Sequence, residues 1–474
     1  MGALKAAWER LRAWSVRHGA TVSLVASVVL VAYFAVSVIH FALDGHPLSY
    51  LDEHVHFDTA LKLHAGELSY RGALVGQGVV QEWACGVGHQ AGPPLHGCDH
   101  PELSASSLPS GKYTSGYIHY PTYFVLAELF RWPIDLLPGD RSALDVYRLF
   151  SALCMILGVI ASGAAAYALG IRRVGLIAAV TVPVAASTIM VMGGIVNPNS
   201  LGVLCGALIA GTGIAWIRRG RGFVWFAVAA AFGSSVAVVC SLPVGGFLLA
   251  MLVTLLARRF GWRVTYEQWR PRWWQLGALA ALVLAPVVLW GRYIAATATV
   301  SNAQVYGAYP FRGWSTLLIG VSAELGALHT PWTDWDMAMA TSPDLAAQLM
   351  RAVATGWPVA ITALIFGGLV FTVLRSNFDE RTRFPHTAFT RRNLNPVHLL
   401  AIGTLAALIL YPAAMRFSNV LTFGIDIGIV ARYSIAFGPV LVILLLLRVR
   451  QRATHWLLSG AGAIGMITVA GVWL

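Results

Sequence analysis

The residues best suited to do chemistry in this sequence lie between positions 52 and 58. Three carboxylates and two imidazoles stand within this short stretch, contributed by Asp52, Glu53, His54, His56 and Asp58. A positioned carboxylate can remove a proton from an alcohol, and histidine can accept or pass on a proton. On a helix, Asp52 and His56 would be neighbours four residues apart, and so would His54 and Asp58. The cluster therefore predicts proton-transfer chemistry at a single site.

Two simpler interpretations of this cluster stay open. In the first, Asp52 caps a helix in a solvated loop by accepting a backbone hydrogen bond. In the second, the histidines and carboxylates bind a divalent metal, although their spacing matches no metal motif that we can name. We do not favour the metal, and no cofactor is indicated with certainty.

The elements that must position this cluster belong to a membrane protein. Of the 474 residues, 57% are hydrophobic and only 11% are charged, whereas soluble globular proteins carry about 25% charged residues. The fold class expected is an all-α polytopic membrane protein, a single transmembrane domain over residues 1–474. Ionisable groups near the bilayer cost roughly 2.5–3.5 kcal/mol each on insertion scales, so a cluster at its edge usually has a function.

Eleven apolar runs are long enough to be membrane-spanning helices. They lie at about 20–43, 149–170, 174–195, 200–217, 222–240, 243–257, 275–294, 349–374, 397–415, 433–447 and 455–474. The basic stretch before the first run, with no small-residue cleavage site after it, indicates a retained helix rather than a removed signal peptide.

The segment 117–137 decides the topology, because it is apolar but is broken by Pro121 and Pro133. If the N-terminus is cytoplasmic and this segment does not cross, the inner face holds 22 of the 33 basic residues and 4 of the 21 acidic ones. The positive-inside rule favours that arrangement, since a crossing would move every later arginine cluster outside. We therefore predict eleven spans with the N-terminus inside and the C-terminus outside. The net charge of +12 then reflects topology, and no nucleic-acid partner is expected.

Three outer segments are large enough to contain a site. They are the first extracytoplasmic loop at 44–148, with its juxtamembrane segment, a second at 295–348, and a third at 416–432. The inner loops are short and basic and contain no nucleotide-phosphate motif. Chemistry is therefore expected on the outer face.

Two cysteines of the first loop, Cys85 and Cys98, are expected to form a disulfide outside the cell. Three nearby histidines leave a structural zinc site as the alternative, although the order of ligands matches no standard zinc finger.

Four short motifs resemble those of an uncharacterised bacterial branch of the GT-C glycosyltransferase superfamily. Asp52-Glu53 with His56-Phe57 resembles its D-E-P-A-H-F pattern, and Tyr120-Pro121-Thr122-Tyr123 resembles Y-P-P-L-Y. Gly194 to Asn199 resembles G-x-x-N-P-D, and Arg432-Tyr433 resembles G-R-Y-F-L-P. The sequence departs from these patterns at His54, Thr122, Asn199 and Ala431.

The resemblance implies a GT-C-like fold and an outer-face site that takes a sugar from a polyprenyl-phosphate carrier. Asp52 is then the first candidate for general base and Glu53 the second, with His54, His56 and Asp58 as supporting groups. Tyr120, Tyr433, Asn197 and Asn199 become candidates for contacts with sugar or acceptor, although the two asparagines could equally cap a helix.

A lipid-phosphate donor requires cations at the outer interface, because negative charge grows on the leaving phosphate. Arginine suits this role, since its planar guanidinium binds phosphate oxygens in pairs. Arg432 ranks first because it opens a late span within a resembling motif. Arg416, Arg292 and Arg312 are further candidates, and each could instead extend toward the membrane interface.

The first hypothesis is an inverting glycosyltransferase in a bacterial plasma membrane, with an extracytoplasmic active site and a glycan or glycolipid acceptor. Its partners would be the polyprenyl-phosphate-linked sugar donor, that acceptor and the lipid bilayer. The alternative is a transporter or flippase of lipid-linked sugars, which should carry ionisable residues near the middle of the bilayer.

Overall fold

The computed structural model describes most of the chain. The described residues are 2–49, 52–85, 105, 108, 110–138, 141–264, 266, 268–301, 308–327, 329–332, 357–372, 393–449 and 451–471. Helices dominate this part of the chain, and its strands are two to three residues long. β1 (Arg263–Val264) pairs in parallel with β3 (Asn393–Leu394), and β2 (Ala308–Pro310) pairs antiparallel with β4 (Ile425–Ile427).

Six helices of the described part are long and apolar enough to cross a membrane. They are His18–Leu43 of α1 (Gly2–Leu43), α5 (Ala143–Ala168), Pro198–Arg219 containing α8 (Gly202–Arg219), α12 (Trp273–Thr297), α15 (Pro396–Phe423) and α17 (Arg452–Gly471). A bent pair, Val174–Val184 and Ser187–Gly194, turns by 70° and makes seven if it counts as one span. It comprises α6 (Val174–Thr181), η3 (Val182–Val184) and α7 (Ser187–Gly194). The polytopic all-α class is therefore confirmed.

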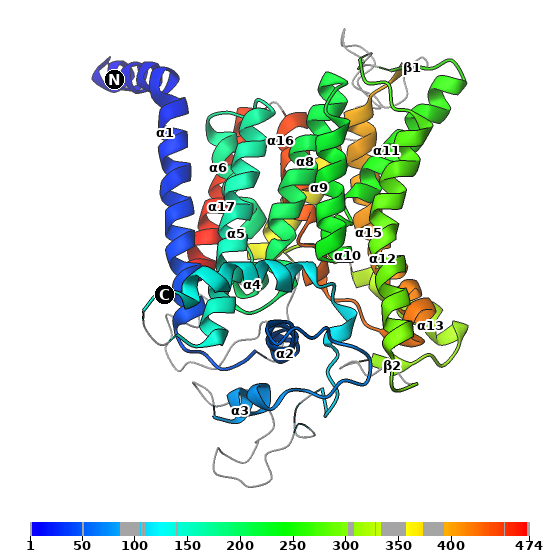
Figure 1. Cartoon of the computed structure of the whole chain (residues 1–474). Helices are drawn as coiled ribbons and strands as arrows, with labels where there is room; N and C mark the ends of the chain where they lie inside the picture. The colour runs from blue at the N-terminus through cyan, green and yellow to red at the C-terminus, as the bar shows by residue number, and fades with distance from the viewer. Residues whose placement is uncertain are drawn as a thin grey trace.

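Shorter helices occupy the other predicted spans. They are α9 (Phe223–Val236) with α10 (Val238–Ser241), α11 (Val244–Arg259), Trp357–Thr372 and α16 (Phe437–Arg448). Each is below the roughly 20 residues that a perpendicular crossing needs, although α9, α11 and α16 stand beside the long helices in Figure 1. Every predicted run thus contains a helix, while the count of eleven crossings stays a prediction.

Three predicted boundaries lie inside helices of the structure. α5 begins at Ala143 rather than at 149, and α12 continues to Thr297. α15 continues to Phe423, so Arg416 lies within a helix and not in the loop expected at 416–432. Each helix extends beyond the apolar run that predicted it, because polar residues beyond that run form the same backbone hydrogen bonds between residues four apart.

α4 (Thr122–Asp135) accounts for the proline-broken segment at 117–137. It lies across the end of the bundle instead of parallel to it (Figure 1). Leu129, Trp132 and Leu136 are all more than 60% exposed, which gives the helix an apolar outer surface. This arrangement agrees with the prediction that the segment does not cross.

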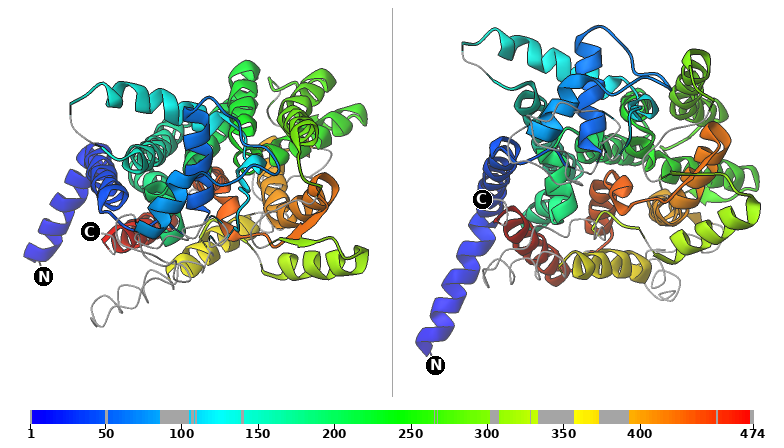
Figure 2. Two further views of the ribbon diagram at one scale, coloured as in Figure 1. Left: turned by 60° about the horizontal axis from the view of Figure 1, so that its bottom comes forward. Right: turned by 90° about the horizontal axis from the view of Figure 1, so that it is seen from below.

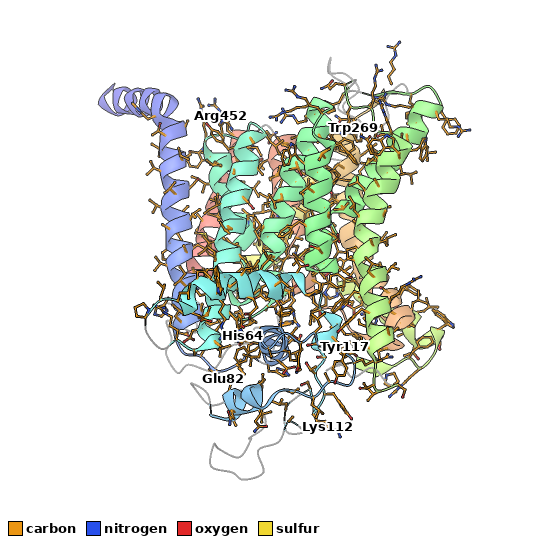
Figure 3. The ribbon with its side chains drawn as sticks, viewed as in Figure 1. His64, Glu82, Lys112, Tyr117, Trp269 and Arg452 are labelled. Carbon is orange, nitrogen blue, oxygen red and sulfur yellow. The ribbon has the colours of Figure 1, made fainter. Side chains whose placement is uncertain are left out.

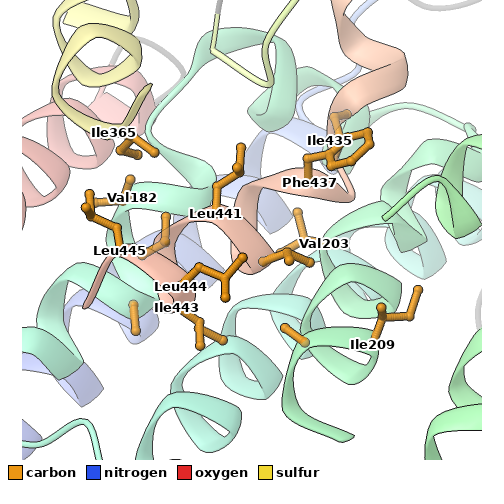
Figure 4. Close-up of a cluster of buried hydrophobic side chains, with 14 of the residues drawn as sticks. Val182, Val203, Ile209, Ile365, Ile435, Phe437, Leu441, Ile443, Leu444 and Leu445 are labelled. Atoms are coloured by element: carbon orange, nitrogen blue, oxygen red, sulfur yellow. The ribbon is translucent and has the colours of Figure 1, made fainter. Parts of the chain in front are cut away.

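The core of the bundle surrounds α16. Leu441, Ile443, Leu444 and Leu445 are buried on every side of this helix, as Figure 4 shows, which is what an apolar helix without a polar face requires. A Cβ at Gly206 of α8 would collide with the carbonyl oxygen of Ala436, so glycine lets the start of α16 pack directly on α8.

Different elements lie at the two ends of the bundle. Arg452 and Trp269 mark one end in Figure 3, the end where the chain begins. The other end carries α2 (Glu53–His64), α3 (Gln77–Cys85), α4, β2, α13 (Trp314–Ala327) and the C-terminus (Figure 1). Seen from that end in Figure 2, α2 lies over the bundle. The acidic cluster at 52–58 is therefore positioned on α2 at this end.

Candidate active site

Asp52 stands directly before α2 but does not cap it. Its backbone has φ 65° and ψ 7°, the left-handed conformation, and its side chain accepts no hydrogen bond from the helix. Non-glycine residues rarely adopt that conformation, although aspartate does so more often than most. The carboxylate turns instead to Arg432, whose Nη2 donates to Asp52 Oδ2 at 3.1 Å. The helix-cap interpretation of Asp52 is therefore wrong.

Burial and Arg432 act in opposite directions on this carboxylate. Burial, the larger effect, raises the pKa of Asp52 above its usual value, while the Arg432 charge and hydrogen bond lower it. The side chain is still 30% exposed, against 9% for Arg432. Asp52 is thus an accessible carboxylate with increased basicity beside a shielded cation.

Arg432 comes from the opposite end of the sequence. It lies in the 3-10 turn η5 (Ala431–Ser434), which leads into α16, so the buried core helix fixes its position. Its guanidinium carbon is 5.6 Å from the ring centre of Tyr433. The predicted pair Arg432-Tyr433 therefore contributes a cation and an aromatic ring to one place.

Two histidines next to this pair share a hydrogen bond. His56 Nδ1 is 3.0 Å from the carbonyl oxygen of Val196, and its Nε2 is 3.1 Å from His119 Nε2. Since a carbonyl only accepts, His56 donates from Nδ1, and its Nε2 accepts the proton of His119 Nε2. Burial, aided by the Arg432 charge, lowers the pKa of both rings, that of His119 to about 4. Both histidines are therefore neutral at physiological pH.

Glu53 is held in a buried ion pair with Arg148 of α5. Arg148 Nε donates to Oε1 at 2.8 Å and Nη2 donates to Oε2 at 2.9 Å. The backbone amides of Ser49 and Val196 donate to the same carboxylate at 2.7 and 3.0 Å. Burial raises the pKa of Glu53, but Arg148 and these hydrogen bonds outweigh it and hold the pKa below its usual range. Glu53 thus ties α2 to three other segments.

His54 and Asp58 also make structural contacts. His54 Nε2 is 3.1 Å from Ser110 Oγ and its ring meets the edge of Trp83, while burial lowers its pKa to about 4. Asp58 pairs with Lys62 and accepts the backbone amide of Gly76 at 2.8 Å. Both side chains position α2 against the rest of the loop.

The other arginine candidates lie apart from Asp52. Arg416 donates to Asp426 Oδ1 at 2.7 Å and to Glu324 Oε1 at 3.1 Å, so two carboxylates balance its charge. Arg292 and Arg312 are exposed. Of the four predicted arginines, Arg432 is the one that hydrogen-bonds to the acidic cluster among the described residues.

Asn197 is buried and caps the turn η4 (Pro198–Leu201), since its Oδ1 accepts the amide of Asn199 at 2.9 Å. Its helix-cap interpretation is therefore confirmed, and Asn199 is buried beside it. Tyr120 packs edge-on against Trp290 at 6.2 Å between ring centres, and burial raises its pKa to about 12.

A small cavity adjoins His119 and is lined by Thr59, Ser69, Gly116 and Trp290 among others. The buried Ser69 hydroxyl has no hydrogen-bond partner within the described chain. A Cβ at Gly116 would collide with Thr59 Oγ1, so glycine is what allows this segment to approach α2.

The disulfide predicted between Cys85 and Cys98 involves side chains outside the described residues. Cys154, Cys205 and Cys240 are free and buried. Among the described residues, no group of three histidine, cysteine or acidic side chains is placed to hold a metal ion.

His119, Arg148 and Trp290 were not among the predicted site residues. His119 directly precedes Tyr120 of the resembling motif, which was a usable signal. No motif marks Arg148 or Trp290, because each hydrogen-bonds to a residue more than 90 positions away in the chain. Arg148 donates to Glu53, and Trp290 donates to the carbonyl oxygen of Tyr117.

Comparisons with known proteins add little to this geometry. No family model and no curated protein matches the chain. A solved structure that it resembles is ArnT from Cupriavidus metallidurans bound to undecaprenyl phosphate, at 14% identity over 92% of this chain and 77% of that one. The TM-score is 0.35, and a likeness at that level supports no conclusion about function.

Proposed function

We propose that the chain is an inverting, outer-face glycosyltransferase of the GT-C type that moves a sugar from a polyprenyl-phosphate donor to a cell-envelope acceptor. One observation carries the proposal. A carboxylate of raised pKa faces a shielded arginine at 3.1 Å, at the end of the helical bundle that carries α2, α3 and α4 (Figure 1). A base beside a phosphate-binding cation is what this reaction needs.

In the proposed step, Asp52 accepts the proton of an acceptor hydroxyl, and the oxygen of that hydroxyl forms a bond to the anomeric carbon of the sugar. The bond from that carbon to the phosphate oxygen breaks, and the electron pair leaves with the polyprenyl phosphate. Attack and departure on opposite faces invert the anomeric centre. Arg432 stabilises the charge on the leaving phosphate.

Asp52 is better suited than Glu53 to act as the general base. Both oxygens of Glu53 are already occupied by Arg148 and backbone amides, and its pKa is lowered. A strongly hydrogen-bonded carboxylate is a weak base. The carboxylate of Asp52 is 30% exposed, and its pKa is raised because burial outweighs the hydrogen bond from Arg432 to its Oδ2.

Arg432 is better suited than Arg416 to bind the donor phosphate, because Glu324 and Asp426 already neutralise the charge of Arg416. A phosphate arriving at Arg432 would compete with Asp52 for the guanidinium. Its binding would thereby free the carboxylate when the substrate is present.

The cavity beside His119 has a volume of about 10 Å³, which is enough for one water molecule and too small for a sugar ring. Thr59 and Ser69 contribute hydroxyls to its lining. His119 donates from Nε2, which leaves its Nδ1 able to accept a hydroxyl proton.

The second candidate is a transporter or flippase of lipid-linked sugars. The 70° break between Val184 and Ser187 favours it, because transporters use broken helices. However, the candidate spans contain a single acidic residue, Asp145, in the first turn of α5. Coupling residues near the middle of the bilayer are therefore missing from these spans.

Purified protein supplied with polyprenyl-phosphate sugars and membrane-derived acceptors would test the proposal. We expect transfer that Asp52→Asn abolishes and that Asp145→Asn, a carboxylate at the same end, leaves intact. Transbilayer movement of the lipid-linked sugar in vesicles, without any transferred product, would instead establish the transporter.

A further inference from the structure

A groove at the arginine-rich end of the bundle is not used by the proposed reaction. It lies between α5, α8 and α9 and has a volume of about 620 Å³. Its walls are small residues such as Ala164, Gly211 and Ala215, and Arg219 and Arg221 stand at its mouth. α2, which Asp52 directly precedes, lies at the opposite end of the same bundle (Figure 1).

The groove opens toward the surface that faces lipid. Residues on both flanks are exposed: Ile160 of α5 is 49% exposed, and Trp225 and Val228 of α9 are 70% and 55% exposed. α5 and α8 approach closely beside it, since a Cβ at Gly211 would lie 2.9 Å from the Cβ of Ala165. Small side chains therefore create a recess in a surface that is otherwise covered by large apolar residues.

The arginines at the mouth form hydrogen bonds with backbone carbonyls. Arg218 Nη1 donates to the carbonyl oxygen of Leu169 at 2.5 Å, and Arg219 Nη2 donates to that of Ala168 at 3.5 Å. These bonds hold both guanidinium groups over the end of α5. Within the described chain, Arg218, Arg219 and Arg221 form no salt bridge with a carboxylate. The described residues therefore place positive charge at the mouth without a carboxylate paired to it.

We propose that this groove binds an anionic phospholipid of the adjoining leaflet, with an acyl chain in the recess and the headgroup phosphate at Arg219 and Arg221. An apolar recess open to the bilayer is filled by lipid, because water there would leave its hydrogen bonds unmade. The arginines then select the headgroup, as basic pockets between membrane helices do. This inference is independent of the proposed glycosyltransferase activity.

Native mass spectrometry of the purified full chain tests the proposal. The protein is relipidated with an equimolar mixture of dioleoyl phosphatidylglycerol and dioleoyl phosphatidylcholine. We expect the wild type to retain phosphatidylglycerol preferentially. Arg219→Gln/Arg221→Gln should reduce that preference at least about fivefold, the effect expected of one arginine at an anionic surface. Ala164→Leu/Ala215→Leu, which fills the groove without removing charge, should reduce retention of both lipids.

Arg259→Gln/Arg263→Gln is the matched control, because both arginines are exposed at the same end and lie outside the groove. The control should keep the preference. Equal retention of the two lipids by the wild type would overturn the proposal. An equal loss in the control, or no effect of the groove-filling pair in a monodisperse protein, would do so as well.

Discussion

Asp52 and Arg432 are 380 positions apart in the chain, and their side chains meet at 3.1 Å. Asp52 directly precedes α2, while Arg432 leads into the core helix α16. The contact therefore fastens the start of α2 to the turn before the core helix and joins the two groups that the proposed reaction needs.

Asp52→Asn should lower the rate of sugar transfer by about 10²–10⁴-fold, the usual cost of losing a general base. The amide keeps the shape and the hydrogen bond to Arg432 but cannot take up the proton. Donor binding should survive, measured by retention of a labelled polyprenyl-phosphate sugar. Full activity in a monodisperse Asp52→Asn protein would eliminate Asp52 as the base.

Arg432→Gln should weaken donor binding and shift the pH dependence of the remaining activity. Asp52 is active when ionised, so transfer declines as pH falls through its pKa. Arg432 lowers that pKa, and its removal should raise it further. The acidic limb of kcat/KM should therefore move to higher pH, and Arg432→Lys should keep it closer to the wild-type position. If the acidic limb of kcat/KM stayed at the same pH in Arg432→Gln, the group that titrates there would not be Asp52.

Glu53→Gln should destabilise the protein, because it leaves the buried Arg148 without its counter-charge. Breaking such a pair costs about 3–5 kcal/mol, whereas replacing both partners with apolar residues costs much less. Thermal unfolding in detergent, followed by tryptophan fluorescence, should show a lower Tm for Glu53→Gln and partial recovery in Glu53→Leu/Arg148→Met. An unchanged Tm in the single variant would contradict the structural role.

The same ion pair predicts a direction for acid stability. The pKa of Glu53 is lowered in the folded protein, so its stabilisation is complete above the ordinary pKa of a glutamate and is lost as pH falls through the folded value. The wild-type Tm should fall with pH across that window. The fall should be smaller in Glu53→Gln, and equal slopes in the two proteins would argue against this assignment.

Arg416→Gln should impair stability rather than donor binding, since Arg416 joins Glu324 to Asp426. Parallel measurements on Arg416→Gln and Arg432→Gln separate the two roles. The first should have the lower Tm and a normal KM for the donor. A raised KM for the donor in Arg416→Gln would contradict this prediction and indicate that Arg416 binds the donor phosphate.

Residue types and their order along the chain were enough to predict the fold class and where the acidic cluster lies relative to the helices. Hydrophobic runs gave helices at every predicted span, because a chain in lipid must satisfy its backbone hydrogen bonds internally. Arginine counts indicated that the segment containing Pro121 and Pro133 does not cross, and α4 lies across the bundle. Local residue types also placed the acidic cluster after the first span.

The contacts of each carboxylate could not be predicted in this way, because they depend on how the folded segments pack. Asp52 and Glu53 are adjacent in sequence, but Asp52 has a left-handed backbone conformation before α2, whereas Glu53 is the first residue of the helix. One meets Arg432 and the other meets Arg148, which comes from a different helix. The partner of each, its burial and hence its pKa depend on packing between distant segments, and residue spacing along the chain carries no record of that packing.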